Sequence, residues 1–165
     1  MTGDVGDYEA QIPNLTRHKW RCASKKDPSY NCIAWAAGDT TRNWWPPSHL
    51  GAVTYWPPGI LAFETLAAFI QAFETLGYEV CDHPGLEVGM EKVAIFVSAR
   101  TGAPTHAARQ LPSGQWTSKL GAGIDIVHDD LEAVGGEMAL EFGSVAAVLV
   151  RPGPSTRDSM TWSRQ

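Results

Sequence analysis

The sequence has few cysteines, no long apolar run and no excess of basic residues, and each lack excludes a class of protein. Three cysteines in 165 residues are too few for a disulfide scaffold and fit a compartment that keeps thiols reduced. No stretch approaches the roughly 18 apolar residues of a membrane helix. The acidic N-terminus also lacks the basic start and apolar run of a signal peptide. We therefore expect a cytoplasmic protein with no membrane partner.

Charge and length narrow the class further. Lysine and arginine number 13 against 18 aspartate and glutamate residues, for a net charge of −5. Proteins that bind phosphate backbones use many basic residues, so we expect no nucleic-acid partner. The length predicts one domain over residues 30–151. Residues 1–29 are polar with little periodicity, which predicts a wrapping loop or arm, and residues 152–165 have the composition of a flexible tail.

The stretch around Cys32 is the first with a chemical signal. The turn-forming Asp27-Pro28-Ser29 precedes it, alanines at 34, 36 and 37 favour a helix, and Gly38 can end that helix. Cys32 therefore falls in the first turn of a buried helix, where the dipole favours a reactive thiolate. A free cysteine is also among the most commonly buried residues, so Cys32 is either a nucleophile or a small core residue.

A long segment rich in tryptophan and proline follows the Cys32 helix. Trp44-Trp45-Pro46-Pro47 is followed by Tyr55-Trp56-Pro57-Pro58, and paired prolines disfavour a helix. Such a long irregular segment is usually functional or disordered, and its large aromatics argue against disorder. The rings either fill the core or form the wall of a substrate groove beside Cys32. The candidate substrate-binding residues are Trp35, Trp44, Trp45, Trp56 and Trp116.

The rest of the chain predicts one more helix and a sheet. Apolar residues at helical spacing predict an amphipathic helix over 64–76, ended by Gly77. Apolar runs and turn residues predict an edge strand near 77–84, a central strand at 93–97, and strands at 104–111, 116–120 and 145–150. Residues 124–131 are ambiguous and fit a strand that passes into a short helix. The predicted class is α+β, with the Cys32 helix and the second helix packed on an antiparallel sheet.

This order of elements favours thiol catalysis. A cysteine nucleophile needs a base within hydrogen-bond reach, and a cysteine helix packed on a sheet that carries His106 can supply one. His128, beside Asp129, is a competing base, although it also suits a helix start or a surface position. Arg109 and Lys119 suit either carboxylate recognition or a solvated strand face. The spacing of cysteines and histidines matches no common zinc pattern, so we expect no metal or cofactor.

Two sets of motifs each carry a resemblance to a known family. The stretch 106–116, HAARQLPSGQW, resembles the histidine hairpin of transglutaminase-like domains in the papain-like superfamily. The motifs NCIAWA, THAARQ and WTSKLG resemble an uncharacterised bacterial family over about residues 30–151. The papain-like resemblance implies that Cys32 is the nucleophile and His106 the general base. Ser118 stands near the place of the usual orienting acid, and Asn31 is a candidate oxyanion donor.

These expectations lead to two functional hypotheses. The first is a cysteine-dependent hydrolase or acyl transferase that acts on amide bonds of a peptide or protein, as a peptidase, amidase or deamidase. The second is a papain-like fold without catalysis, which binds a protein or peptide through its tryptophan- and proline-rich segment.

Overall fold

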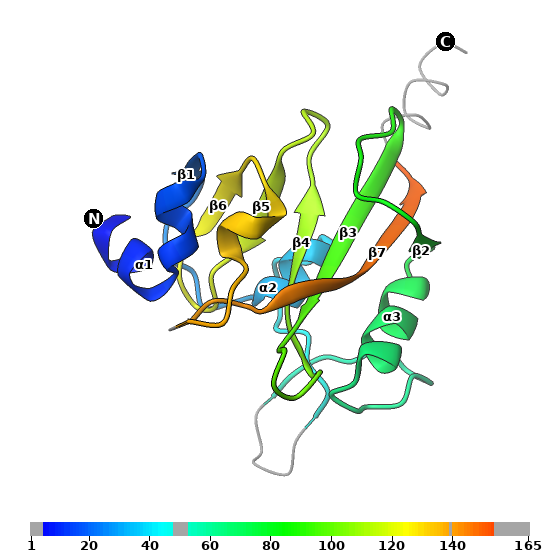
Figure 1. The fold of residues 1–165 in the computed structure, drawn as a ribbon. Helices are drawn as coiled ribbons and strands as arrows, with labels where there is room; N and C mark the ends of the chain where they lie inside the picture. The colour runs from blue at the N-terminus through cyan, green and yellow to red at the C-terminus, as the bar shows by residue number, and fades with distance from the viewer. Residues whose placement is uncertain (1–4, 48–52, 139, 154–165) are drawn as a thin grey trace.

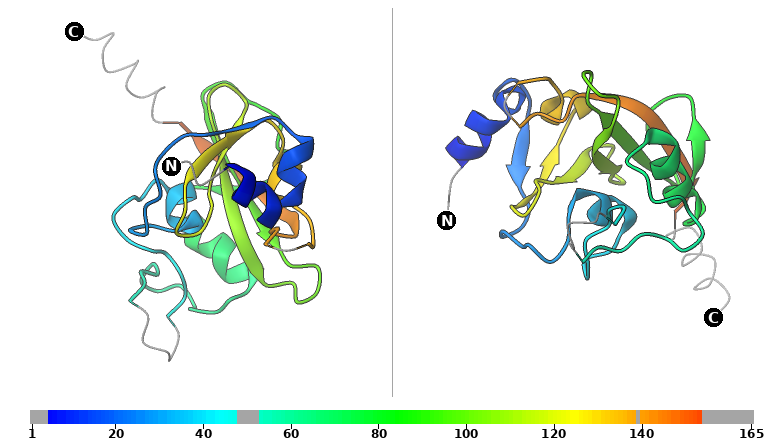
Figure 2. Two further views of the ribbon diagram at one scale, coloured as in Figure 1. Left: turned by 90° about the vertical axis from the view of Figure 1, so that its left-hand side faces the viewer. Right: turned by 90° about the horizontal axis from the view of Figure 1, so that it is seen from below.

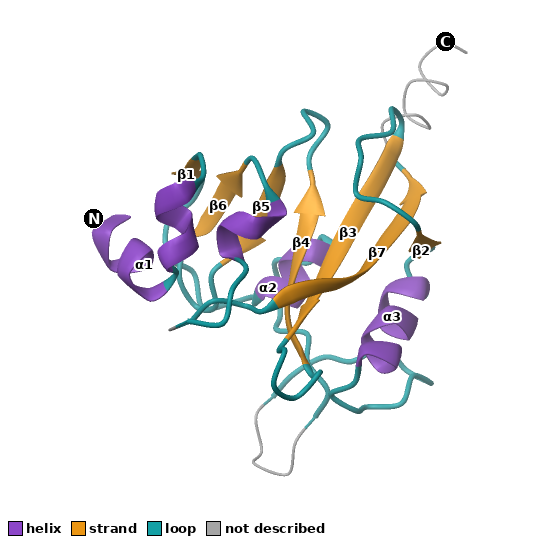
Figure 3. Ribbon diagram, viewed as in Figure 1, coloured by secondary structure: helices purple, strands orange, loops and turns teal. Residues whose placement is uncertain are grey.

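A computed structural model describes residues 5–47, 53–138 and 140–153, which build a mixed α/β fold around a seven-stranded antiparallel sheet (Figures 1 and 3). The strand order is β1-β6-β5-β4-β3-β7-β2. The strands are β1 (Trp20–Cys22), β2 (Glu79–Cys81), β3 (Met90–Val97), β4 (Pro104–Gln110), β5 (Trp116–Lys119), β6 (Asp125–His128) and β7 (Ser144–Pro152). The helices are α1 (Val5–Gln11), α2 (Cys32–Ala37) and α3 (Leu66–Glu74), with 3₁₀ turns η1 (Pro13–Arg17) and η2 (Leu131–Val134).

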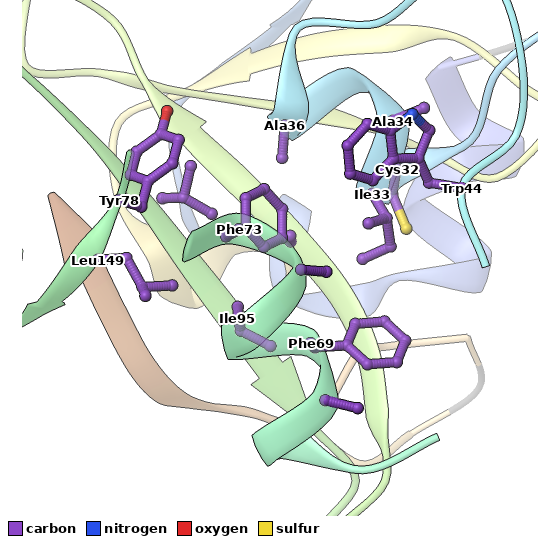
Figure 4. Close-up of a cluster of buried hydrophobic side chains, with 14 of the residues drawn as sticks. Cys32, Ile33, Ala34, Ala36, Trp44, Phe69, Phe73, Tyr78, Ile95 and Leu149 are labelled. Carbon is purple, nitrogen blue, oxygen red and sulfur yellow. The ribbon is translucent and has the colours of Figure 1, made fainter. Parts of the chain in front are cut away.

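The sheet has a different cover on each face. Helices α2 and α3 pack on one face, here called the α2 face, and η1 and η2 pack on the other, the η2 face (Figure 2, right). Each face has its own apolar cluster. The cluster on the α2 face includes Ile33, Phe69, Phe73, Ile95 and Ala107 (Figure 4). The cluster on the η2 face includes Leu15, Phe96, Ala108, Trp116 and Ile126.

Alternation along the central strands explains the two clusters. Successive side chains of a strand point to opposite faces. Ile95 of β3 and Ala107 of β4 accordingly belong to the α2 face, whereas Phe96 and Ala108 belong to the η2 face. Strands that are buried on both faces are apolar throughout, as the sequence indicates for residues 93–97. In β4, odd-numbered side chains therefore point toward α2, and even-numbered side chains point toward η2.

Most of the predicted elements are confirmed. The helix that begins at Cys32 ends at Gly38, whose φ of +85° is the left-handed conformation that glycine adopts readily. Helix α3 lies within 64–76 and begins after Thr65, whose side chain accepts a hydrogen bond from the Ala68 amide. The ambiguous stretch 124–131 is a strand, β6, followed by the turn η2.

The N-terminal segment differs from the predicted loop. Residues 5–22 contain α1, η1 and β1, and β1 pairs with β6 at the edge of the sheet. Leu15 is fully buried in the η2-face cluster, so this segment completes the second core. The predicted tail begins inside β7, which extends to Pro152, and residues 154–165 lie outside the described residues. No helix within the described ranges has the length and apolarity needed to cross a membrane.

Candidate functional site

Cys32 occupies the first turn of α2, as predicted, but its side chain is part of the core. Only 7% of the residue is exposed, and its sulfur lies among the apolar side chains of the α2-face cluster (Figure 4). The contact of Sγ with the Thr105 carbonyl oxygen is long, at 4.0 Å. Burial raises the pKa of Cys32 to about 11, and nearby backbone N–H groups and the charge of Lys119 only partly oppose that effect. The thiol is therefore neutral at physiological pH.

His106 lies on the other side of the sheet. Its ring stacks on Phe142 with centroids 4.1 Å apart and meets the edge of Phe96 at 5.3 Å. Phe96 is in the η2-face cluster and Phe142 packs against it, whereas Cys32 belongs to the α2 face. The expected contact between Cys32 and His106 is therefore not formed. The physical reason is strand alternation, since Ala107 and not His106 points toward α2.

The structure instead joins His106 to Ser118 and His128 in a chain across three strands. Oγ of Ser118 lies 2.8 Å from Nε2 of His106 and 2.8 Å from Nε2 of His128. Nδ1 of His128 lies 2.9 Å from the carbonyl oxygen of Asp130. All three side chains are fully buried, so His128 is not the helix-start or surface residue that the sequence suggests. This places the two candidate bases in one enclosed network.

The network has one consistent proton arrangement. The carbonyl of Asp130 only accepts, so His128 must donate from Nδ1 and accept at Nε2. The Ser118 hydroxyl then donates to His128 and accepts from Nε2–H of His106. Nδ1 of His106 is left as a buried acceptor with no partner among the described residues. Ser118 is thus a bridge between two neutral imidazoles.

Both imidazoles resist protonation. Burial lowers the pKa of His106 to about 3, with a further contribution from the charge of His128. Burial also lowers the pKa of His128, although the Asp130 carbonyl and neighbouring acidic groups oppose the change. An imidazole that stays neutral and enclosed is a poor proton carrier for a reaction at the surface.

The folded protein should lose stability as the solution is made moderately acidic. In the unfolded chain each histidine titrates near pH 6.5, so below that pH the unfolded state binds protons that the folded state excludes. The stabilising contribution is complete above about pH 6.5 and declines as the pH falls toward the folded-state values. We expect a loss of about 2 kcal/mol from His106 between about pH 7 and about pH 5, and a further loss from His128, measurable by urea unfolding.

A variant separates this effect from other titrations. His106→Asn removes one of the two groups, so its free energy of unfolding should fall by about 2 kcal/mol less over this pH range than that of the wild type. The carboxyl groups with lowered pKa values, Asp39 and Glu87, titrate at lower pH and leave this window unaffected. A wild-type free energy that is flat between these two pH values would contradict the neutral network.

Asn31, the candidate oxyanion donor, caps α2 and also binds the tryptophan-rich segment. Its Oδ1 accepts from the amides of Ala34 at 3.0 Å and Trp44 at 3.1 Å, and its Nδ2 donates to the Trp44 carbonyl at 2.8 Å. The first contact caps α2 and the other two attach the tryptophan-rich segment to that helix. One of the two N–H groups of Nδ2 is thus engaged in the fold, and only the other is left for the oxyanion role predicted from the sequence.

Asn31→Ala should therefore cost more than the loss of an ordinary helix cap. We expect a decrease of about 2–3 kcal/mol in the free energy of unfolding, because a cap and two further hydrogen bonds are removed. Thr65→Ala is the matched control: Thr65 caps α3 through one hydrogen bond, and its loss should cost about 1 kcal/mol. Equal losses in urea unfolding would contradict the tethering role.

The candidate substrate-binding tryptophans do not form one groove. Trp44 and Trp56 are buried, and their indole N–H groups donate to the Asp39 carboxylate and the Leu61 carbonyl. Trp45 packs edge-on against Phe69 at 5.1 Å, and Trp35 is half-buried with its N–H bonded to Thr117 at 3.0 Å. Trp116 lies on the η2 face. The rings of the 44–56 segment therefore fill the core, which is one of the two roles predicted for them.

A second group of ionisable residues lies on the α2 face. Lys119 is fully buried, its Nζ donates to the Gly121 carbonyl at 2.7 Å, and it lies 4.8 Å from the centre of the Tyr30 ring. The Tyr30 hydroxyl donates to Asp125 at 2.8 Å. Burial lowers the pKa of Lys119, and Asp125 and Cys32 oppose that shift. Lys119 is thus not on the solvated strand face that was one alternative, and it is the cation whose charge acts on Cys32.

Two surface hollows lie on the η2 face. The first, the Gln110 hollow, has a volume of about 280 Å³, and its lining includes Leu86, Gln110, Trp116, Asp130 and Glu132. The second has a volume of about 320 Å³ and is lined in part by Asn14, Phe96 and Ser144. Leu131 and Glu132 line both, so the hollows flank the turn η2. The sequence does not single out Gln110 as a site residue, although its side chain lies on the same face of β4 as that of His106.

The described residues contain no group of three or more histidine, cysteine, aspartate or glutamate side chains placed to hold a metal ion. Comparison with curated proteins gives no match, and comparison with solved structures gives none either. A family model described as a domain of unknown function, DUF7689, matches residues 21–150, from β1 to β7. Because that match covers most of the 165 residues, the chain belongs to the DUF7689 family.

Proposed function

We propose that this chain is a non-catalytic domain that binds a protein or peptide on its η2 face. The observation that carries the proposal is the pair of hollows on either side of η2, whose linings share Leu131 and Glu132. The groups expected to perform thiol chemistry support a structural role, because Cys32 is neutral in one core and His106 is enclosed in the other.

In this proposal the chain has a papain-like arrangement of helix and sheet but does not catalyse the reaction of papain-like enzymes. A helix that begins at Cys32 and packs on β4 and β5 of an antiparallel sheet supports that likeness. Fold alone does not imply chemistry, since the same framework can carry unrelated functions. In this proposal the framework remains and the Cys-His pair is absent, so His106 and Ser118 stabilise the sheet that supports the binding face.

The binding surface differs from the one proposed on sequence grounds. Trp44 and Trp56 are buried in the α2-face cluster, so they offer little area to a partner. The η2 face instead exposes Leu86, with 47% of its surface accessible, and Glu132 beside open volume. Interfaces depend on such concave sites, where an apolar wall and a few polar groups fix a partner's orientation.

Selection from a random peptide library tests the proposal. The full chain should enrich peptides that bind with dissociation constants of about 1–100 μM, typical of small interfaces. Glu132→Lys changes a side chain shared by both hollows and should abolish binding of these peptides. The matched control is Glu74→Lys, an equal charge reversal at an exposed position of α3, and should leave binding unchanged. Failure to enrich any peptide that distinguishes the two variants would contradict the proposal.

A cysteine-dependent hydrolase or acyl transferase acting on amide bonds is the second candidate. One observation favours it: Cys32 is at the N-terminus of α2, and the positive charge of Lys119 acts on its thiol. Both effects stabilise a thiolate, although burial outweighs them. In this alternative Lys119 replaces His106 as the group that assists the thiol. The reactivity of Cys32 distinguishes the two candidates.

A further inference from the structure

We infer that the Gln110 hollow binds the side chain of an arginine in the partner segment. This inference rests on the proposed function and identifies the chemistry that the η2 face recognises. Three features of the hollow support it: a lining residue with a buried acceptor that has no partner among the described residues, carboxylates at its rim, and a size that suits one long side chain.

The buried acceptor is Oε1 of Gln110. The residue lines the hollow, is only 6% exposed, and donates from Nε2 to the Pro84 carbonyl at 2.9 Å. That hydrogen bond fixes the orientation of the amide, because a carbonyl requires a donor. Oε1 is then left with no hydrogen-bond partner among the described residues. A buried acceptor without a donor is costly, so a ligand that brings a donor close to Gln110 gains free energy.

The rim supplies negative charge. Asp129, Asp130 and Glu132 line the hollow, and all three are exposed. Asp129 uses Oδ1 to accept from Gln115 at 2.8 Å, and Asp130 uses Oδ2 in a 3.1 Å contact with His18. These contacts engage one oxygen of each aspartate. The nearby cation Lys92 is paired with Glu87 at 2.8 Å, so it does not neutralise the rim.

The shape and the chemistry both favour arginine. A volume of about 280 Å³ is at the lower end of small-molecule sites, and it suits one side chain better than a larger ligand. Pro84 and Leu86 provide an apolar wall for the aliphatic stem, and Trp116 provides an aromatic surface. The guanidinium group carries five donors and no acceptor, which complements a site made of acceptors.

Short peptides test this inference directly. The probe is a blocked pentapeptide with arginine between two pairs of glycines, and the controls replace arginine with lysine or with citrulline, its uncharged isostere. Binding is followed through the NMR signals of the Trp116 indole N–H and the Gln110 side-chain amide in the full chain. The arginine peptide should bind in the millimolar range, and the citrulline peptide at least about 10-fold more weakly. Raising the ionic strength from about 0.05 M to about 0.3 M should weaken only the charged peptides.

Isosteric variants connect the binding to this site. Asp129→Asn combined with Asp130→Asn removes two of the three negative charges at the rim with little change in shape, and should weaken arginine binding by about 10-fold or more. Glu74→Gln on α3 is the control and should have no effect. Arginine binding that survives the double substitution, or equal binding of the citrulline peptide, would overturn the inference.

The outcomes also separate this inference from the proposed function. If library peptides bind and are lost with Glu132→Lys, but arginine and citrulline peptides behave alike, then the surface is correct and the arginine assignment is wrong. If neither library peptides nor the arginine peptide bind, both the assignment and the proposed function are wrong.

Discussion

Replacing Ser118 with alanine should lower the free energy of unfolding by about 3 kcal/mol. The Ser118 hydroxyl is the partner of Nε2 on both His106 and His128, and all three side chains are fully buried. The substitution leaves one buried donor and one buried acceptor without partners, and each such group costs about 1–3 kcal/mol. Neither imidazole can recover by protonation, because burial holds the pKa of each below its ordinary value.

Urea unfolding of the full chain at about pH 7.5 measures this loss. Ser113→Ala is the matched control, since Ser113 is exposed in the turn between β4 and β5 and, within the described part of the chain, its hydroxyl forms hydrogen bonds to Gln115 alone. That control should change the free energy of unfolding by less than about 0.5 kcal/mol. A Ser118→Ala variant as stable as the control would show that the bridge between the two imidazoles does not form.

Much of the architecture could be predicted from local patterns. The spacing of apolar residues identifies α3, and the alanines after Cys32 with Gly38 identify α2. Short apolar runs bounded by turn residues identify β3, β4, β5 and β7. These signals work because helix caps, turns and periodicity depend on residues close in sequence.

The candidate pair could not be predicted in the same way. The sequence places Cys32 in a helix and His106 in a strand, as observed. Whether the two side chains come into contact depends on which face of β4 packs against α2. Thr105, His106 and Ala107 are consecutive, so a shift of one residue in the strand would turn His106 toward α2 instead of away from it. The face on which His106 lies is shown by tertiary packing: Ala107 is in the α2-face cluster, and His106 stacks on Phe142 on the opposite side.

Two other differences between the predicted and the observed structure also arise from tertiary packing. Residues 5–22 contain few apolar residues in a regular pattern, yet Ile12 and Leu15 complete the η2-face core once β1 pairs with β6. His128 looked like a surface residue because two aspartates follow it, but strand β6 directs its side chain inward. Tertiary packing, and not local composition, determines the burial of such residues.

The second large effect expected is a very low reactivity of Cys32. Burial raises its pKa from 9.0 to about 11, which lowers the thiolate fraction at neutral pH by about 100-fold relative to an ordinary thiol. Its low exposure slows the approach of a reagent as well. The chain contains an internal control for this reactivity, because Cys22 is a free, exposed thiol whereas Cys32 is buried.

Site-resolved labelling with iodoacetamide, read by mass spectrometry of the native chain between about pH 6 and about pH 9, is the most direct test of whether this domain binds or catalyses. We expect Cys32 to react at least about 100-fold more slowly than Cys22 near neutral pH, and the two rates to become comparable only after unfolding in urea. Labelling of Cys32 that is faster than that of Cys22 near pH 6 would reveal an activated thiolate, and would support a cysteine-dependent enzyme instead of a binding domain.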